Sequence, residues 1–432
     1  MNEFDKQLAG AEKKDSSVEY ADKVFFDRFY KQAEKYGNGG DLPNNLSAEL
    51  KQLFDERKKR IEDRELECSE EYIGTKLTET QGKKSKSDVY TLKSLTKTVK
   101  RRFTVKNSNG KTLSKKENVC LCADIITADP QNIADNTQFC CPECGRTDSL
   151  KQLEEGCPEC GNSTFITGLL PRVQSFFIKK STSLDLIDIG KILLAAAIIG
   201  FVFGIPMIAV AMITDMPDTM EGDALKDLLW GSLMMPLKCT LLGAGIGIFV
   251  ILGRIIFNEV KYSAKITKTS ERLKSLNAFV KKYDRNFSAE HFEKTAVRLI
   301  QLALFSSDPN ELTVFRTHTP VKNYPVIDSV YTGFMDIKSI RAEENMCIVD
   351  AEITMSDIYD LRTRFGRQED VFAVRLQRSL SAVTNKTMEL KNMECPECKK
   401  HFDALSFSHC SFCGREFPVW EHEWVVKELK VK

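Results

Sequence analysis

Two long apolar stretches in the middle of the chain restrict its fold more than any other feature. Residues 192–213 form a run of 22 residues without a charge, and residues 228–257 are apolar except for Lys238 and Arg254. At about 1.5 Å of rise per residue, a helix of the first run is about 33 Å long, enough to cross a hydrocarbon core of about 30 Å. The sequence predicts a transmembrane hairpin (181–257) with spans at about 190–213 and 231–255.

The charges around these stretches predict how the hairpin is oriented. The loop between the spans is acidic, whereas both outer flanks are basic, and basic flanks stay on the cytosolic side during insertion. We therefore expect a multi-pass membrane protein with both termini in the cytosol. The basic flanking residues are Arg172, Lys179, Lys180 and Lys191 before the first span, and Arg254, Lys261, Lys265, Lys268 and Arg272 after the second.

Composition leaves room for folded modules on both sides of the hairpin. The chain has 432 residues and a net charge of only +1. It therefore lacks the overall excess of positive charge that would indicate nucleic acid binding. It contains 14 cysteines, and eight of them form four Cys-x-x-Cys pairs. In reducing cytosol, such pairs indicate a metal site rather than disulfides.

The paired cysteines have the spacing of two zinc ribbons. In each ribbon, eleven or twelve residues separate two Cys-x-x-Cys pairs, so four thiolates can surround one tetrahedral Zn²⁺ ion. Because sulfur fills every coordination position, both ions are expected to be structural rather than catalytic. Cys140 is an alternative to its neighbour Cys141. The predicted ligands are Cys141, Cys144, Cys157 and Cys160 in the first ribbon (139–166), and Cys395, Cys398, Cys410 and Cys413 in the second (393–416).

Other residues near the ribbons are not expected to bind metal. Cys120 and Cys122 lie in a predicted strand, and His401 and His409 are near a quartet that is already complete. We therefore expect these four side chains to remain unliganded.

Local patterns predict helices in both halves of the chain and strands after residue 325. Apolar residues recur at helical spacing over residues 17–36, and Ser47 has the position of an N-cap for a second helix that extends to Ile61. Ser288 is a second cap, with Phe287 and Phe292 at the positions of a hydrophobic staple. Helices followed by antiparallel strands predict an α+β fold.

The segment from Lys83 to Lys116 has twelve basic residues and one acid, Asp88. Such a run is suited to anionic lipid or, alternatively, RNA. The simpler interpretation is a solvent-exposed hairpin, because two short strands would flank a turn at Asn109-Gly110. The basic residues are Lys83, Lys84, Lys86, Lys93, Lys97, Lys100, Arg101, Arg102, Lys106, Lys111, Lys115 and Lys116.

Residues from about Arg272 onward resemble the Tim-forty-four-like domain family, especially its bacterial membrane-anchored members with a zinc ribbon. The similar features are YDRNFSAEHFEKTAVRLIQLALFSSDPNELTVF, the strand pattern that follows, and a ribbon placed before the final WEHEWVVKEL strand. The resemblance implies a nuclear-transport-factor-two-like cone, with helices on a curved antiparallel sheet, and a tethering role at a bacterial plasma membrane.

Together these features predict four regions. They are an N-terminal helical segment (1–74), a basic β segment with the first ribbon (75–180), the hairpin (181–257) and a Tim-forty-four-like domain with the second ribbon (258–432).

The favoured function is a non-enzymatic membrane adaptor that binds a protein partner, anionic lipid or both, as a monomer or a homo-oligomer. One alternative is a small-ligand binder or enzyme that uses Asp350, Glu352 or Arg364 in the cone. Another is a membrane-tethered nucleic-acid-binding protein. Against an enzyme, the sequence shows no nucleophile paired with a base, no phosphate loop and no open metal site.

Overall fold

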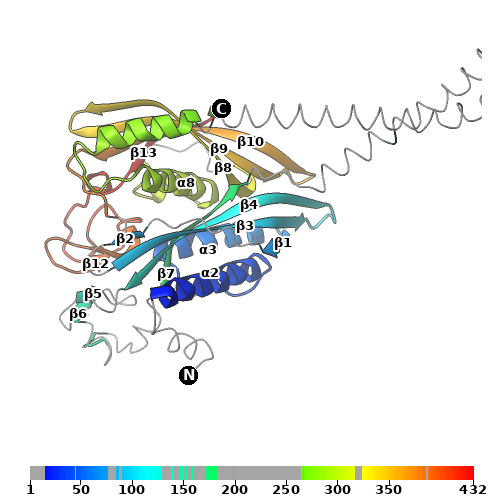
Figure 1. Ribbon diagram of the computed structural model, residues 1–432, viewed down its shortest axis with the longest axis horizontal. Coiled ribbons are helices and arrows are strands. Elements are labelled where there is room, and N and C mark those ends of the chain that lie inside the picture. The colour runs from blue at the N-terminus through cyan, green and yellow to red at the C-terminus, as the bar shows by residue number, and fades with distance from the viewer. Residues whose placement is uncertain are drawn as a thin grey trace, which may run out of the picture. The chain divides into compact units, whose positions relative to one another are not determined.

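Strands from both halves of the chain join in one large mixed sheet (Figure 1). The computed structural model describes residues 15–75 (except 44), 90–128, 171–181, 267–316, 324–385 and 388–432, together with short pieces at 84–86, 138–140, 146–149, 152, 157–159, 198 and 264–265. The chain divides into two compact units, residues 1–181 with 269–432 and residues 182–268. The sheet belongs to the first unit.

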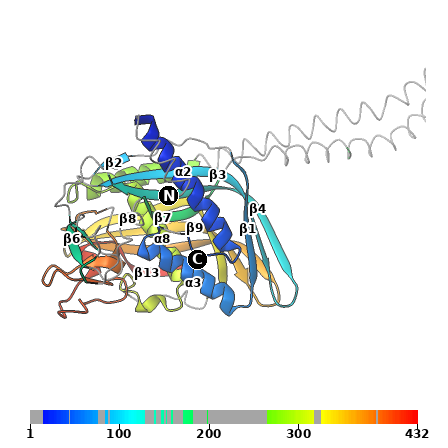
Figure 2. The same cartoon turned by 90° about the horizontal axis from the view of Figure 1, so that it is seen from below.

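The first half of this unit contributes helices followed by an antiparallel meander. Helix α2 (Asp15–Gly37) and helix α3 (Ala48–Asp63) precede the strands and lie across the sheet in Figure 2. The strand order is β1-β3-β4-β7, with β2 on β3. The strands are β1 (Glu67–Thr75), β2 (Lys84–Lys86), β3 (Tyr90–Lys106), β4 (Thr112–Ala128) and β7 (Arg172–Lys180).

The second half repeats this arrangement. A helical segment at residues 269–280 and helix α8 (Ala289–Phe305) precede a second antiparallel meander, β8-β9-β10-β13. In each meander, a cysteine-rich segment lies between the third and fourth strands. The two meanders meet where β7 pairs in parallel with β8. The strands of the second meander are β8 (Val326–Glu343), β9 (Met346–Asp360), β10 (Phe365–Ser379) and β13 (Val425–Val431).

Short elements complete the described structure. Two-stranded hairpins lie in both cysteine-rich segments, and three short 3-10 helices lie in the second half. The hairpin strands are β5 (Gln138–Cys140) with β6 (Thr147–Ser149), and β11 (Met393–Glu394) with β12 (His401–Phe402); the 3-10 helices are η1 (Pro309–Glu311), η2 (Leu390–Asn392) and η3 (Val419–Glu421).

The predicted helix starts are confirmed. Ser288 caps α8, and the staple residues Phe287 and Phe292 lie 6.3 Å apart between ring centroids. Both rings also pack against Trp424, which is only 1% exposed and precedes β13. The staple therefore attaches the start of α8 to the last strand of the second meander.

Ser47 caps α3 as predicted and also connects this helix to the sheet. Its Oγ accepts a hydrogen bond from the backbone N–H of Leu50 (3.2 Å) and donates one to the Gln174 carbonyl on β7 (3.0 Å). Ser47 is fully buried, so Ser47→Ala leaves both backbone groups without this partner. We expect Ser47→Ala to lower the free energy of unfolding by about 1–2 kcal/mol in urea titrations. Ser275→Ala, on an exposed helical serine, is the control and should have little effect.

The predicted cone-shaped fold of the C-terminal region is wrong. Strands of residues 67–180 and strands of residues 326–431 belong to the same sheet, so the second meander is not a separate cone with its own curved sheet. The physical reason is that β7 and β8 each have a free edge after their own meander has formed. Pairing these edges satisfies backbone groups that the sequence pattern alone could not assign to a partner.

The predicted transmembrane hairpin and the plasma-membrane location are also corrected. Among the described helices, none is both long and apolar enough to cross a bilayer. Helix α2 has 23 residues but carries many charges, and α8 is apolar but has 17 residues and is buried against the sheet. The stretches 192–213 and 228–257 lie outside the described residues, except for Ile198.

Part of the charge asymmetry behind the hairpin prediction has a different role. Arg172 and Lys180, which were counted as a basic flank, are strand residues of β7. Arg172 forms an ion pair with Glu389 (2.6 Å), and Lys180 forms one with Glu369 (2.8 Å). These cations hold loops and strands of the second meander against the first.

The basic segment forms a hairpin, as the simpler interpretation predicted, but with longer strands. β3 and β4 have 17 residues each and pair from Tyr90 with Ala128 to Lys106 with Thr112. Gly110 adopts φ 75° in the connecting turn, a conformation that glycine reaches without a steric penalty.

Several cations of this segment are used inside the fold. Lys97, 1% exposed, donates to Asp27 (2.7 Å) and Tyr30 (2.8 Å), and Arg101 is fully buried among carboxylates. Because these charges are neutralised internally, the segment has fewer cations for lipid or RNA than its composition suggests.

Candidate metal centre

The second cysteine quartet forms a compact cluster between β10 and β13. The β11–β12 hairpin presents Cys395 and Cys398, and a second turn presents Cys410 and Cys413. Backbone hydrogen bonds define both turns, from Lys399 N–H to the Cys395 carbonyl and from Gly414 N–H to the Cys410 carbonyl, each 2.9 Å. The four Sγ atoms all lie within 4.8 Å of one another.

The sulfur geometry fits a tetrahedral metal ion. The Sγ atoms of Cys395 and Cys413 are 3.6 Å apart, and so are those of Cys398 and Cys410. Metal–sulfur bonds of about 2.3 Å in a tetrahedron place the sulfurs about 3.8 Å apart. Backbone N–H groups of Cys398 and Glu397 point at the Cys395 sulfur and lower the pKa of that thiol to about 6. The quartet can therefore hold one metal ion.

Packing holds this cluster against the sheet. Cys395 and Cys410 are 1% exposed, and Phe402 and Phe417 pack edge to face beneath the turns, with 5.3 Å between ring centroids. Thr313 N–H donates to the Leu405 carbonyl, which connects the segment after η1 to the ribbon. The ribbon is thus part of the fold of the second meander.

The neighbouring histidines lie outside the cluster. His401 Nδ1 is 3.3 Å from the Asn392 carbonyl oxygen, and His409 packs against the Phe407 ring. Neither histidine belongs to the metal-binding group. Cys120 and Cys122 lie on β4 and also belong to no such group among the described residues.

Most of the first quartet lies outside the described residues. Cys141, Cys144 and Cys160 are not described, nor is the side chain of Cys140. Cys157 is described and is 2% exposed. The first predicted metal site is therefore neither observed nor contradicted.

The three residues considered for an enzyme do not form a site. Asp350 accepts a hydrogen bond from Ser339 and pairs with Arg341 and Arg375, and these contacts lower the pKa of its carboxyl to about 2 in spite of partial burial. Glu352 pairs with Lys338 and Lys432. Arg364 is exposed beyond the far end of β9, in the turn to β10. The two carboxylates therefore belong to an ion-pair ladder on the strands, and Arg364 is separate from them.

The sequence did not reveal a pair of buried acids in the second meander. Asp357 on β9 is 0% exposed and Asp370 on β10 is 1% exposed. The Tyr359 hydroxyl donates to Asp370, whereas neither carboxylate oxygen of Asp357 has a well-formed hydrogen bond. Burial, together with the nearby charge of Asp370, raises the pKa of Asp357 well above its usual value. The only sequence signal is an aspartate at a core position of a strand, and it does not indicate its partner.

This raised pKa gives stability a definite pH dependence. At pH values between the unfolded-state pKa of about 3.9 and the folded-state pKa of Asp357, the native state binds more protons than the unfolded state. Asp357 therefore lowers the free energy of unfolding as the pH rises through this range. We expect Asp357→Asn to raise the free energy of unfolding by about 1–3 kcal/mol at pH 7.5 and by much less at pH 4, because its amide is neutral and can donate to Asp370. Urea titrations of the wild type and the variant at both pH values measure the change in the free energy of unfolding. An equal change at the two pH values would contradict the raised pKa of Asp357.

Comparisons with known proteins do not assign the chain to a family. No family model matches it, and no curated protein and no solved structure is significantly similar to it. The resemblance to the Tim-forty-four-like family stays a prediction.

Proposed function

We propose that the protein is a non-enzymatic adaptor whose two ribbons are each held by a structural zinc ion and bind a protein partner. The main support is the second quartet, in which four cysteine sulfurs lie close enough together to fill every position around one tetrahedral ion. Such a set suits zinc and leaves no position for water or substrate. The ion would fix the shape of the ribbon rather than take part in a reaction.

The repeated topology supports a second zinc ion in the first ribbon. In the second ribbon, the residue before Cys395 pairs with the third residue after Cys398, Glu394 with His401. In the first ribbon, the residue before Cys141 pairs with the third residue after Cys144, Cys140 with Thr147. The two hairpins therefore have the same register around their Cys-x-x-Cys turns.

This register also favours Cys141 over Cys140 as the ligand, because Cys140 occupies the position of Glu394. Cys157 is buried like its counterpart Cys410. The proposed ligands of the first ion are accordingly Cys141, Cys144, Cys157 and Cys160.

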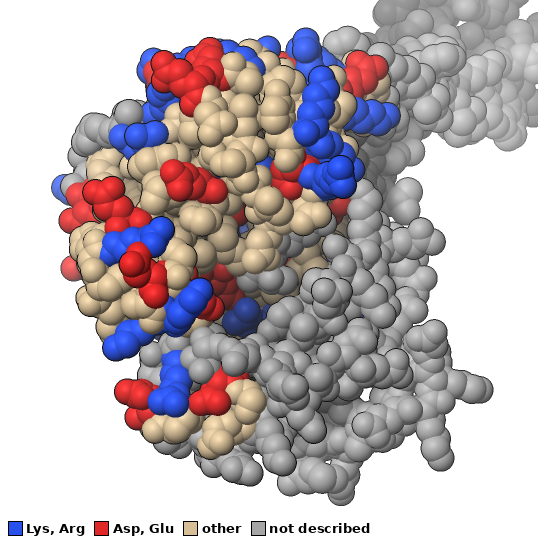
Figure 3. Space-filling view, turned by 90° about the vertical axis from the view of Figure 1, so that its left-hand side faces the viewer, with Lys and Arg blue, Asp and Glu red and all other residues tan. Residues whose placement is uncertain are grey.

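Exposed aromatic residues on the second ribbon support a protein partner. Phe407 is 49% exposed and Phe412 is 55% exposed, whereas most described phenylalanines are buried. Large aromatic side chains at the surface are typical of the centres of protein interfaces. Charged residues of both signs are interspersed with uncharged ones on the described surface in Figure 3, so the view shows no extended basic area for nucleic acid.

The adaptor proposal is tested by replacing both exposed phenylalanines in the full-length protein. Crosslinking in cells, followed by mass spectrometry, should capture a reproducible partner with the wild type. We expect Phe407→Ser with Phe412→Ser to reduce this capture at least tenfold while zinc content and melting temperature stay unchanged. Val383→Ser, which removes an exposed apolar side chain outside the ribbon, is the control. Undiminished capture by the double variant would contradict the proposal.

Single-stranded RNA is the second candidate partner of the ribbon. Lys400 Nζ lies 4.8 Å from the centre of the Phe412 ring, an arrangement of cation and aromatic ring suited to stacking bases. However, the nearby cations Lys399 and Arg415 pair with Glu394 and Glu397. Binding of labelled RNA that weakens steeply with salt would favour this alternative over a protein.

A further inference from the structure

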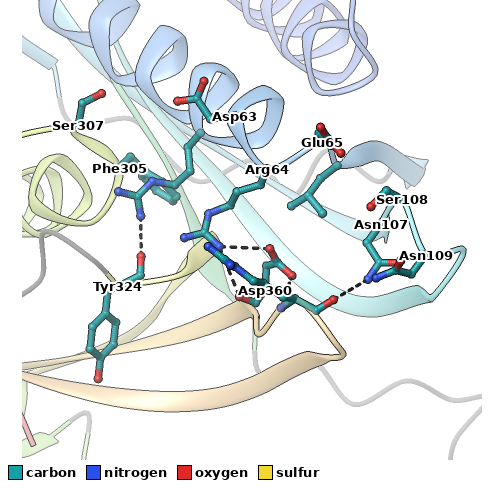
Figure 4. Close-up of a pocket in the computed structure, with 13 residues that line it drawn as sticks. Asp63, Arg64, Glu65, Asn107, Ser108, Asn109, Phe305, Ser307, Tyr324 and Asp360 are labelled. Atoms are coloured by element: carbon teal, nitrogen blue, oxygen red, sulfur yellow. Dashed lines mark hydrogen bonds and ion pairs between the residues drawn. The ribbon is translucent and has the colours of Figure 1, made fainter.

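A cavity of about 850 Å³ lies where the two halves of the sheet unit meet (Figure 4). Its walls come from the C-terminal end of α3, the β3–β4 turn, the C-terminal end of α8 and the β9–β10 turn. We call it the inter-half pocket. Its volume is within the range of about 300–1,000 Å³ that is usual for small-molecule sites. Because each half supplies two walls, the pocket exists only when the halves are paired.

Three arginines line the inter-half pocket. Arg60 donates to the carbonyl oxygens of Tyr324 (2.7 Å) and Ser306 (3.4 Å), not to a carboxylate. Burial and the nearby charge of Arg64 lower the pKa of Arg60 to about 10. Two guanidinium groups thus lie close enough to repel each other.

Asp360 holds the other two arginines at the pocket. Its Oδ2 accepts from Arg64 Nη1 (3.1 Å), and its Oδ1 accepts from the backbone N–H of Arg362 (2.9 Å). Asn107 Nδ2 donates to the Arg362 carbonyl (3.2 Å), which fastens the β3–β4 turn to the β9–β10 turn. The backbone of Arg362 is therefore fixed, while its guanidinium forms no hydrogen bond or ion pair with the described residues.

The pocket is lined by three arginines and three acids, but the arginines are not all paired with carboxylates. Figure 4 shows the carboxylates of Asp63 and Glu65 turned away from the Arg64 guanidinium, which leaves Asp360 as the carboxylate that faces it. Arg64 therefore has Asp360 as its carboxylate partner, whereas the Arg60 and Arg362 guanidinium groups form no ion pair with the described residues. Planar guanidinium groups with free N–H donors match the oxygens of a phosphate, which carries nearly two negative charges at neutral pH.

From this arrangement we infer that the inter-half pocket binds the phosphate group of a small molecule. Arg362 and the remaining N–H donors of Arg64 hold the phosphate oxygens, and Arg60 supplies the third positive charge. Ser108 and Asn109 line the opposite wall and provide polar groups for the remainder of the ligand. This inference is independent of the zinc proposal, because no pocket residue belongs to a cysteine-rich segment.

Isothermal titration calorimetry on the full-length protein at low ionic strength tests the inference. Inorganic phosphate and adenosine monophosphate are the two probes, and acetate is the comparison. We expect saturable binding of one phosphate probe per chain and at least tenfold weaker binding of acetate. Tighter binding of adenosine monophosphate would identify a phosphate monoester as the ligand class, and tighter binding of inorganic phosphate would identify the free ion. The absence of saturable binding by either probe would overturn the inference.

Arg362→Gln is the decisive variant, because this side chain is exposed and forms no hydrogen bond or ion pair with the described residues. It should weaken phosphate binding at least tenfold with an unchanged melting temperature. Arg64→Gln provides a second measurement and should weaken binding similarly. Arg415→Gln makes the same change on an exposed arginine of the second ribbon and should bind like the wild type. Wild-type affinity in Arg362→Gln, or an equal loss in Arg415→Gln, would refute the assignment.

Discussion

Replacing Cys395 and Cys410 with serine is expected to remove one equivalent of zinc and to unfold the second ribbon. Both thiols are buried in the quartet, and serine oxygen is a poor substitute for a thiolate. Zinc binding to a small structural site contributes about 10–16 kcal/mol at pH 7 in isolated peptides, so little of the local fold should survive its loss. Metal analysis of the purified protein and limited proteolysis around residue 400 measure the two effects.

The other half of the sheet provides the comparison for this experiment. If the first quartet is a separate zinc site, the Cys395 and Cys410 variant should retain the zinc equivalent of the first ribbon. Cys141→Ser with Cys144→Ser should lose that equivalent and retain the one in the second ribbon. Cys347→Ser, on a buried cysteine outside both quartets, should retain both equivalents. Full zinc content in the Cys395 and Cys410 variant would show that the ligand assignment is wrong.

Removing the carboxylate of Asp328 should destabilise the protein by about 3–5 kcal/mol, because it leaves Arg101 buried without its main partner. Arg101 on β3 is fully buried and donates to both oxygens of Asp328 on β8, at 2.7 and 2.8 Å. Glu70 on β1 accepts from Arg101 Nε at 2.5 Å. This ion pair connects the first meander to the second across 227 residues of sequence. Urea unfolding of Asp328→Ala measures its loss.

A matched control and a double variant separate this pair from ordinary surface charges. Glu71→Ala removes the partner of Arg102, a pair that joins β1 and β3, but both side chains are exposed, so we expect an effect below about 1 kcal/mol. Arg101→Leu combined with Asp328→Ala should recover much of the lost stability, because no unpaired charge is then buried. If the double variant is as unstable as the sum of the single variants, the pair is not coupled.

The same pair makes the fold sensitive to acid. Burial alone would raise the pKa of Asp328, but the adjacent charge of Arg101 lowers it below its usual value. A lowered folded-state pKa contributes stability above the unfolded value of about 3.9, and this contribution is lost as pH falls toward the folded-state pKa. Asp328→Ala should therefore lose most of its effect in strong acid.

Features that depend on a few neighbouring residues could be predicted from the sequence. Ser47 and Ser288 cap helices through N–H groups three residues away, and Asn109-Gly110 closes a hairpin. The second quartet is equally local, since each Cys-x-x-Cys turn presents two sulfurs whatever surrounds it. A repeated order of helices, strands and ribbon was also present in the sequence, but the length of the first ribbon region and the apolar stretches between the halves obscured it.

Hydropathy was a less reliable guide, because it reports how apolar a run is and not what covers it. Helix α8 is apolar because it is buried against the sheet, with Val297 and Ile300 both fully buried. Basic residues were similarly ambiguous: Arg101 and Lys97 look like surface cations in a basic run, yet they lie in the interior with acidic partners.

The helix starts, the hairpin turn and the four-sulfur site follow from local sequence, because the interacting groups are fixed by backbone geometry over a few residues. Only the folded structure shows that β7 and β8 join two meanders, that Arg101 pairs with Asp328, and that Arg64 reaches Asp360. These contacts join residues more than 100 positions apart, or charges whose state depends on burial. Only the folded chain brings such groups together, and only burial makes their pairing decisive for stability.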